Sequence, residues 1–250
     1  HPFEAPADQL ARYRPEDIPL PLWKGGADAA SVPPAAAKAV GEMDKYPDEV
    51  RRKIVHHYLS SISLIDDNIG RLVDTLKETG QWDNTLIVLV ADHGEFLGNH
   101  GLLRKPSLHY DETLRVPLLI RQPGGLSQGR RISGLVELVD VHPTLLGMLG
   151  VPVNPGVQGK DWSRHIQEGQ TIGKRDIYSD MFDLGVLFER GGGGPYVACR
   201  TLRTEDWKLN IYPTAGRQYG HLFDLRNDPD ESRNLFHDPA YREKREDLLW

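Results

Sequence analysis

Residues 85–95 read Thr-Leu-Ile-Val-Leu-Val-Ala-Asp-His-Gly-Glu, an apolar run that ends on a carboxylate and an imidazole. The first six residues are typical of a short strand that is covered on both faces. Residues 116–120, Val-Pro-Leu-Leu-Ile, form a second candidate strand, with the proline near its start where a missing donor costs little. Because a long helical pattern precedes the first strand, these runs predict an α/β fold with a parallel sheet.

The helical pattern lies directly upstream of that strand. Apolar residues recur at steps of three or four from Ile54 to Leu76, which predicts one apolar stripe on a long helix. Pro47 or Asp48 can begin this helix and Gly80 ends it. The first 46 residues are rich in proline and alanine and predict an extended surface segment with little regular structure.

Farther along the chain, a helix and several short strands are expected. A strand-to-helix passage is predicted between Leu135 and Leu149, with Asp140 or His142 near the helix start and Gly150 as its stop. Short strands are then expected at residues 196–202, 207–212 and 221–225, and a short charged helix at 238–250.

Composition excludes several classes of function. The 250 residues carry 36 acidic against 30 basic side chains, so no basic surplus is available for nucleic acid or an anionic membrane surface. One cysteine rules out an internal disulfide, and no apolar stretch is long enough for a membrane span. Because the sequence begins at His1 without methionine or a signal peptide, we expect it to be part of a longer protein, and its compartment stays open.

Asp92 and His93 are the first candidates for chemistry, since they follow the strand at the edge where α/β sheets build their sites. An adjacent carboxylate and imidazole can both reach one divalent cation. Taken alone, the pair favours a simpler interpretation, a polar turn with a capping aspartate.

Lys105 stands thirteen residues after Asp92 and offers a compact positive charge for a sulfate or phosphate oxygen. Taken alone, it is more often a solvated surface lysine. His100 and His109 flank it and could line a pocket, although solvent exposure or a structural hydrogen bond is the commoner role.

Taken together, residues 91–120 resemble the sulfatase family of the alkaline-phosphatase superfamily, which includes arylsulfatase-like and phosphonate monoester hydrolase-like enzymes. The matching pattern is Asp-His-Gly-Glu, Leu-Gly, His-Gly, the lysine, Tyr-Asp-Glu and Arg-Val-Pro-Leu-Leu-Ile at fixed spacings. Further segments that resemble the family lie at residues 1–6, 63–70, 139–146, 203–209 and 222–231, so nearly the whole chain is covered.

The resemblance implies an alkaline-phosphatase-like α/β sandwich with a mostly parallel central sheet, whose N-terminal part this sequence lacks. Residues 1–155 would be the C-terminal part of the catalytic domain. Residues 156–250 would be a small α+β subdomain with a short antiparallel sheet and a terminal helix.

The resemblance also implies a nucleophile and a metal. The nucleophile is a formylglycine made from Cys or Ser in a Cys/Ser-x-Pro-x-Arg motif, which we expect upstream because this sequence lacks it. One divalent cation is implied, calcium first, with magnesium or manganese as alternatives. Asp92 and His93 would be two of its ligands, Lys105 would contact the sulfate and assist the leaving oxygen, and His100 is a further candidate for substrate binding.

His1 and Cys199 are two further candidates for catalysis. His1 would be the family's active-site histidine if His-Pro-Phe aligned without an offset, but the usual His-x-Pro-Phe pattern puts His1 at the x position. Cys199 has an arginine four residues later but lacks the proline and follows the metal motif, so burial in a strand is the better interpretation.

The leading functional hypothesis is a metal-dependent sulfuric ester hydrolase that acts on a small-molecule or sugar sulfate ester. The alternatives are a phosphonate monoester or phosphodiester hydrolase with the same nucleophile, and a non-catalytic fragment or pseudoenzyme. Without the upstream nucleophile, we expect the 250 residues alone to be inactive.

Overall fold

The computed structural model describes residues 3–20, 27–124, 129–183 and 197–249. The chain divides into two compact units: the first is His1–Ala29, Ala36–Pro106 and Glu112–Pro123, and the second is Ala30–Ala35, Ser107–Asp111 and Gly124–Trp250. This division groups residues 124–155 with the second unit, whereas the sequence analysis placed a domain boundary after residue 155. That boundary stays a prediction.

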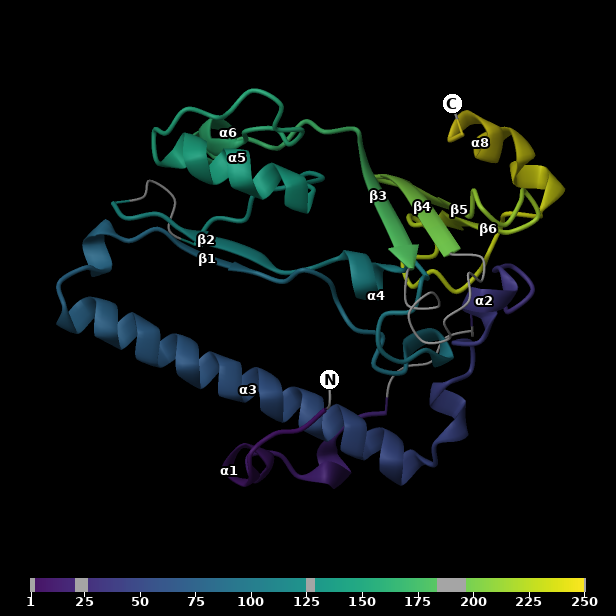
Figure 1. Cartoon of the computed structure of the whole chain (residues 1–250), viewed down its shortest axis with the longest axis horizontal. Coiled ribbons are helices and arrows are strands. Elements are labelled where there is room, and N and C mark those ends of the chain that lie inside the picture. The colour runs from purple at the N-terminus through teal and green to yellow at the C-terminus, as the bar shows by residue number, and fades with distance from the viewer. Residues whose placement is uncertain (1–2, 21–26, 125–128, 184–196, 250) are drawn as a thin grey trace, which may run out of the picture. The chain divides into compact units, whose positions relative to one another are not determined.

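The long helix of the first unit is α3 (Asp48–Glu78), and both of its predicted ends are confirmed (Figure 1). Gly80 takes a left-handed φ of 69°. Its N–H donates to the carbonyl of Lys77 at 3.1 Å, and the next N–H, of Gln81, donates to Leu76 at 2.8 Å. These two bonds satisfy the last carbonyls of the helix, and a glycine allows them because it has no β-carbon to strain the turn.

Two strands of the first unit, β1 (Ile87–Val90) and β2 (Leu118–Arg121), form an antiparallel sheet in which Val90 lies opposite Leu118. The predicted strands and the α/β class are confirmed, but parallel pairing is wrong for these two strands. Residues 91–117 leave and re-enter the sheet at the same end, which an antiparallel pair permits without a crossover. The predicted cover on both faces of residues 85–90 is also wrong, since Leu89 is 41% exposed and Val90 is 42% exposed.

The described parts of the first 46 residues, 3–20 and 27–46, contain short helical turns and are not purely extended. These turns are α1 (Ala7–Leu10), η1 (Pro15–Asp17), α2 (Pro34–Ala37) and η2 (Met43–Lys45). Proline begins two of them, where its missing N–H is tolerated. The side chains of Ile18, Val32 and Met43 are buried, so the prediction of a surface segment was wrong at these positions.

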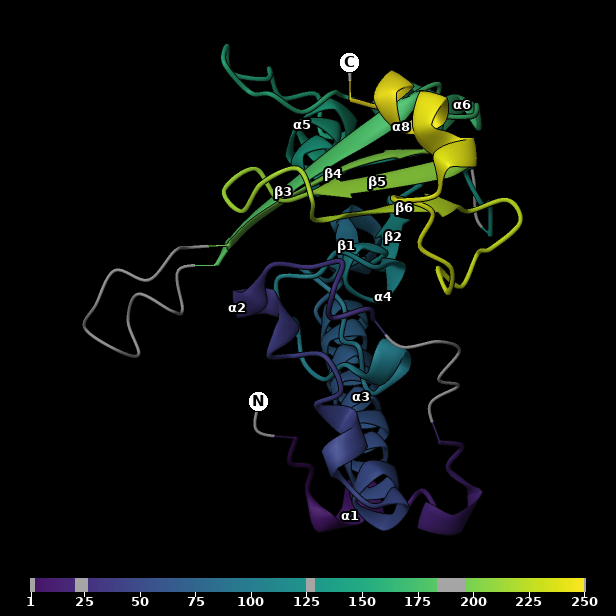
Figure 2. The same cartoon turned by 90° about the vertical axis from the view of Figure 1, so that its right-hand side faces the viewer.

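The second unit contains an antiparallel sheet in the order β3-β4-β5-β6 (Figure 2). Its strands are β3 (Asp176–Asp183), β4 (Val197–Thr204), β5 (Trp207–Ile211) and β6 (Gly220–Asp224). The last three were predicted and β3 was not. Leu209 and Leu222 of this sheet pack with Leu235 and Phe236 into a buried core, which is also contacted by Leu248 after helix α8 (Arg242–Asp247).

Helix α5 (Leu138–Met148) begins where it was predicted, with Asp140 in its first turn, but the strand expected before it is absent from the described residues 129–137. Asp140 accepts hydrogen bonds from the N–H groups of Glu137 at 3.1 Å and Lys160 at 2.8 Å, which joins the helix start to the chain before α6 (Ser163–Glu168). The remaining short elements are η3 (Trp82–Asn84), η4 (Asn99–Gly101), α4 (Asp111–Leu114) and η5 (Pro239–Tyr241). No helix within the described ranges has the length and apolar character needed to cross a bilayer.

Candidate active site

Asp92 and His93 lie side by side just after β1 ends. The Asp92 carboxylate accepts the backbone N–H of His93 at 3.0 Å, and the His93 ring turns back so that Nε2 stands 3.5 Å from Asp92 Oδ2. The Asp92 side chain is 87% exposed and that of His93 is 37% exposed. Both candidate ligand atoms therefore face the same accessible point.

The proton on His93 is located by its neighbour. Nδ1 lies 2.8 Å from the carbonyl oxygen of Gly94, which can only accept, so Nδ1 carries the hydrogen. In the neutral ring this leaves the lone pair on Nε2, and such a backbone bond from the other nitrogen is the usual partner of a metal-ligating histidine. The hydrogen bond from the His93 N–H lowers the pKa of Asp92, and the positive charge of Lys105 lowers it further.

This donor pair fits a divalent cation. Carboxylate and imidazole donors bind such ions at about 2.0–2.6 Å, so two donors 3.5 Å apart can share one ion. In the described part of the chain, no group of three or more His, Cys, Asp or Glu side chains could hold a metal. These residues therefore offer two ligands, and a complete site needs others.

Glu95 organises the loop that leads from His93 to Lys105, a role that the sequence analysis missed. One oxygen of its carboxylate, Oε1, accepts the backbone N–H of Leu97 at 3.1 Å and that of Arg104. Phe96 N–H also donates to the Arg104 carbonyl at 3.2 Å. Burial raises the pKa of Glu95, and these two hydrogen bonds from Leu97 and Arg104 oppose that rise. Glu95 belongs to the Asp-His-Gly-Glu motif, so its position could be read from the sequence. Its hydrogen-bond partners, Leu97 and Arg104, could not.

The same loop has an unusual concentration of left-handed backbone. The φ angle is positive at Leu97 (50°), His100 (55°) and Arg104 (65°), three non-glycine residues, and at two glycines between them. Such strain persists only where surrounding contacts impose it, and it is common at functional sites. Lys105 is exposed directly after the last of these residues.

His100 takes a structural place rather than a position at an open substrate surface. It is 4% exposed, its Nε2 lies 3.4 Å from the Glu112 carboxylate, and its ring packs edge-on against Phe96. Its candidacy for substrate binding stays a prediction, and burial leaves little of the side chain accessible. His109 is likewise buried.

Two candidates for catalysis remain, Cys199 and His1. Cys199 is buried in β4, and burial raises the pKa of its thiol to about 12, as expected of a core cysteine rather than a nucleophile. His1 lies outside the described residues. On α3, Asp67 forms a bidentate pair with Arg12, and Arg71 donates to Asn68.

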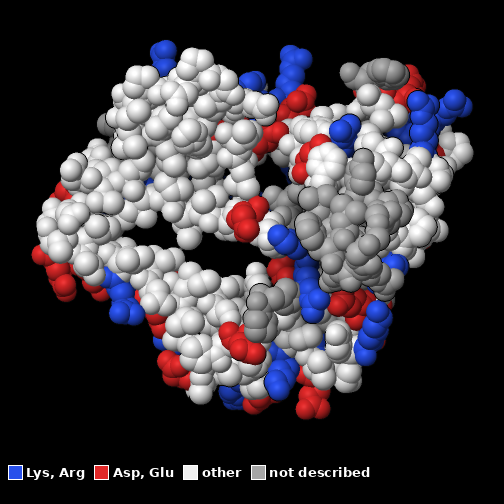
Figure 3. Space-filling model, in the orientation of Figure 1, with Lys and Arg blue, Asp and Glu red and all other residues white. Residues whose placement is uncertain are grey.

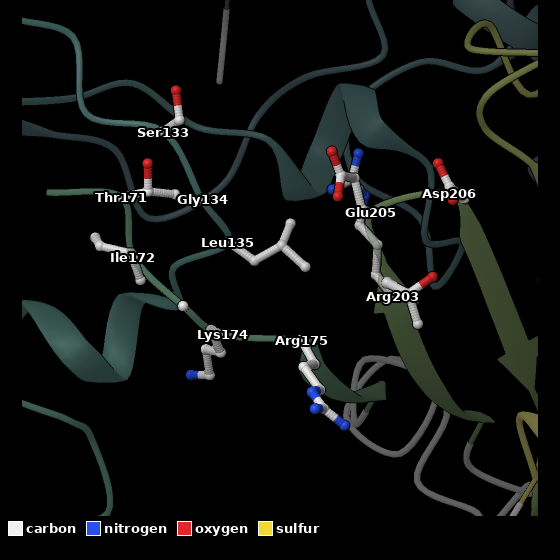
Figure 4. Close-up of a pocket in the computed structure, with 12 residues that line it drawn as sticks. Ser133, Gly134, Leu135, Thr171, Ile172, Lys174, Arg175, Arg203, Glu205 and Asp206 are labelled. Atoms are coloured by element: carbon white, nitrogen blue, oxygen red, sulfur yellow. The ribbon is translucent and has the colours of Figure 1, made fainter.

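A cavity of about 640 Å³ in the second unit contains none of the predicted site residues (Figure 4). Several of its charged side chains already have partners: Lys174 pairs with Glu137 and Asp140, and Asp206 pairs with Arg226. On the face shown in Figure 3, acidic and basic side chains are interspersed. The candidate active site therefore rests on Asp92, His93 and Lys105.

Comparison with known proteins identifies the family. Residues 1–151 match the Sulfatase family model, and residues 98–249 match the model described as N-sulphoglucosamine sulphohydrolase, C-terminal. The chain belongs to the sulfatase family, whose members are hydrolases. Its α/β fold is that of the C-terminal portion of alkaline-phosphatase-like enzymes.

Three relatives illustrate the range of this family. The multifunctional alkaline phosphatase superfamily protein PehA of Trinickia caryophylli is 33% identical over 96% of this chain and 50% of its own length. The phosphonate monoester hydrolase SpPMH of Silicibacter pomeroyi superposes with a TM-score of 0.82 at 29% identity, over 99% of this chain and 52% of its own. The protein BT4656, solved with its substrate D-glucosamine-2-N,6-O-disulfate, gives a TM-score of 0.69 at 30% identity, over 82% of this chain and 42% of its own. The chain thus spans about half the length of the relatives it matches.

Proposed function

We propose that this chain carries half of the metal site and the sulfate-binding lysine of a metal-dependent sulfuric ester hydrolase. The observation that supports this most directly is the Asp92–His93 pair, with an exposed carboxylate oxygen and the imidazole Nε2 3.5 Å apart. Two adjacent acceptors without a hydrogen between them gain most from a shared cation.

Asp92, His93 and Lys105 would have different roles in the reaction. Asp92 and His93 would hold a divalent cation, calcium first and magnesium or manganese as alternatives, and His93 is oriented by its bond to Gly94. When bound, the cation would act as a Lewis acid on the ester oxygens, and a formylglycine outside this sequence would supply the nucleophile. Lys105 would offset negative charge on a sulfate oxygen and on the leaving oxygen.

A sulfate ester of a sugar or small molecule is the proposed substrate class. The substrate of BT4656, D-glucosamine-2-N,6-O-disulfate, supports a sulfated sugar. Because the formal net charge is -6, an anionic sulfate ester would have to be held by local charge such as that of Lys105.

Calorimetric titration with Ca²⁺ and Mn²⁺ tests the metal pair. We expect weak binding to the chain that is lost in Asp92→Ala and His93→Ala. Asp66→Ala is the matched control, since it removes an exposed carboxylate from α3 and should leave the binding heat unchanged. Binding that survives both site substitutions would refute the proposed ligands.

A phosphonate monoester hydrolase is the second candidate, favoured by the likeness to SpPMH over nearly the whole chain. The complete protein should be assayed on matched aryl sulfate and phenyl phosphonate esters. We expect the larger kcat/KM for the sulfate, and a preference for the phosphonate would replace the first proposal by the second.

The 250 residues by themselves are proposed to have no turnover, as in the non-catalytic alternative, since their cysteine is buried and protonated.

A further inference from the structure

A closed ring of buried hydrogen bonds holds the segment that follows Lys105. His109 Nδ1 lies 2.7 Å from Thr201 Oγ1 in β4, Thr201 Oγ1 donates to Asn210 Oδ1 in β5 at 2.8 Å, and Asn210 Nδ2 donates to the His109 carbonyl at 2.8 Å. All three side chains are at most 3% exposed. Side chain and backbone of one residue, His109, are therefore tied to two neighbouring strands.

The direction of each bond in the ring follows from chemistry. Because the Thr201 hydroxyl donates to Asn210, its oxygen must accept from His109, so His109 carries its hydrogen on Nδ1. The second hydrogen of the Asn210 amide faces His221 Nδ1 at 3.4 Å, and His221 Nε2 then donates to Ser31 Oγ at 3.0 Å. A buried network of such bonds favours one arrangement and opposes others.

A second, largely buried system holds Asp111, two residues after His109 in the same segment. Asp111 N–H donates to a Glu231 carboxylate oxygen at 2.7 Å. The Asp111 carboxylate pairs with Lys208 Nζ at 2.9 Å, and Lys208 also pairs with Glu231. The stretch from His109 to Asp111 is thus fixed by both neutral and charged partners.

The connection from this segment back to Lys105 is short and stiff. Pro106 has a fixed φ and confines Lys105 to extended backbone conformations. Only Pro106, Ser107 and Leu108 separate Lys105 from His109, and the last two are buried. On its other side, Lys105 follows Arg104, whose N–H is held by Glu95. The backbone of Lys105 is therefore restrained from both directions along the chain.

We propose that Thr201, through the ring with His109 and Asn210, is a positioning residue that sets where the Lys105 ammonium stands. This inference rests on the proposed role of Lys105 at the leaving oxygen. It assigns to the C-terminal sheet, which is remote from the metal motif in sequence, a part in the reaction.

The test is the leaving-group dependence of kcat in the complete protein. Thr201→Val keeps the shape and removes the hydroxyl, whereas Thr201→Ser keeps the hydroxyl. Thr144→Val is the matched control: Thr144 is also buried, accepts from Trp162 N–H at 3.0 Å and donates to the Lys160 carbonyl at 3.3 Å. Lys105→Ala provides the reference for complete loss of the ammonium.

We expect Thr201→Val to lower kcat about tenfold to a hundredfold for esters with poor leaving groups, because a misplacement of about 1 Å has that cost. The effect on good leaving groups and on KM should be within about threefold, since these depend less on the lysine. Thr201→Ser should restore the wild-type ratio, and Thr144→Val should not change it. The ratio between poor and good leaving groups is insensitive to the folded fraction, because unfolded molecules lower both rates equally.

The results separate the role of Lys105 in the reaction from the positioning role of Thr201. If Lys105→Ala steepens the leaving-group dependence and Thr201→Val does not, the positioning role is wrong while the role of Lys105 stands. If Lys105→Ala leaves the dependence unchanged, both are wrong. Hydrogen exchange gives a readout without substrate: residues 107–111 should exchange faster in Thr201→Val than in Thr144→Val, and equal rates would overturn the proposal.

Discussion

A β-carbon placed on Gly94 would stand 1.9 Å from the carbonyl oxygen of Glu112, far inside any real contact distance. The Gly94 N–H donates to the neighbouring carbonyl of Thr113 at 2.9 Å, and the Gly94 carbonyl accepts from His93 Nδ1. The backbone of α4 therefore packs directly on the turn that carries the two proposed metal ligands. Only glycine allows this approach.

Gly94→Ala should consequently displace the turn and weaken cation binding by Asp92 and His93. We expect the free energy of unfolding to fall by about 1–3 kcal/mol, the usual cost of an overpacked site. Denaturant titration measures this change. Gly70→Ala is the control, because a β-carbon there has nothing within 4 Å and should stabilise α3 by about 0.5–1 kcal/mol. Equal stability of wild type and Gly94→Ala would show that the contact with Glu112 yields easily.

Local signals explain which parts of the fold were predictable. The periodicity of α3 and the glycine after it lie within one stretch of sequence, as do the apolar runs of β1 and β2. Strand β3 was missed because it contains Asp176, Asp180 and Asp183, a residue type depleted in strands. Its pairing with β4 stabilises it, and this pairing cannot be predicted from the residues of β3 alone.

The site likewise has residues that the sequence predicts and contacts that it does not. Asp92, His93 and Lys105 stand close in sequence, so their spacing could be read directly. The ring of His109 could not, since its partner Thr201 is 92 residues away and only the folded sheet brings them together. The burial of His100 was equally hidden, because it depends on the left-handed turn that brings its ring to Glu112.

The buried ring predicts a specific pH dependence of stability. Burial lowers the pKa of His109 to about 4, the charge of Lys208 lowers it as well, and Asp180 opposes them. In the unfolded chain the pKa is about 6.5, so between these values the unfolded state binds more protons. The free energy of unfolding should thus fall as the pH drops from about 6.5 to 4, by on the order of 3 kcal/mol from this residue.

His109→Asn isolates that contribution, since the asparagine amide can replace the Nδ1 donor but does not titrate. Urea titrations of both proteins across this pH range should show wild type losing more stability than the variant on acidification. Other groups titrate equally in both proteins and cancel in the difference. Parallel pH profiles would mean that His109 is not held neutral in the folded state.

The 250-residue chain by itself should not hydrolyse sulfate esters. Its single cysteine is buried with a thiol pKa raised to about 12, so at neutral pH it is neither accessible nor ionised. A chromogenic aryl sulfate assay of the 250-residue chain should give no signal above buffer, with or without added Ca²⁺ or Mn²⁺. Activity that persists in Cys199→Ala would reveal a nucleophile elsewhere in the chain.

The ion cluster around Lys208 should contribute far more to stability than the exposed ion pairs. Lys208 is fully buried between Asp111 and Glu231, so Lys208→Met leaves carboxylates without their cation and should cost about 3–5 kcal/mol. Arg226→Met breaks a pair of similar length with Asp206, but both partners are partly exposed, and it should cost less than about 1 kcal/mol. Adding Glu231→Gln to Lys208→Met should recover part of the loss, because Asp111 still pairs with Arg203 and the other buried charge is removed. Denaturant titration of the three variants tests this order, and similar losses for Lys208→Met and Arg226→Met would disprove it.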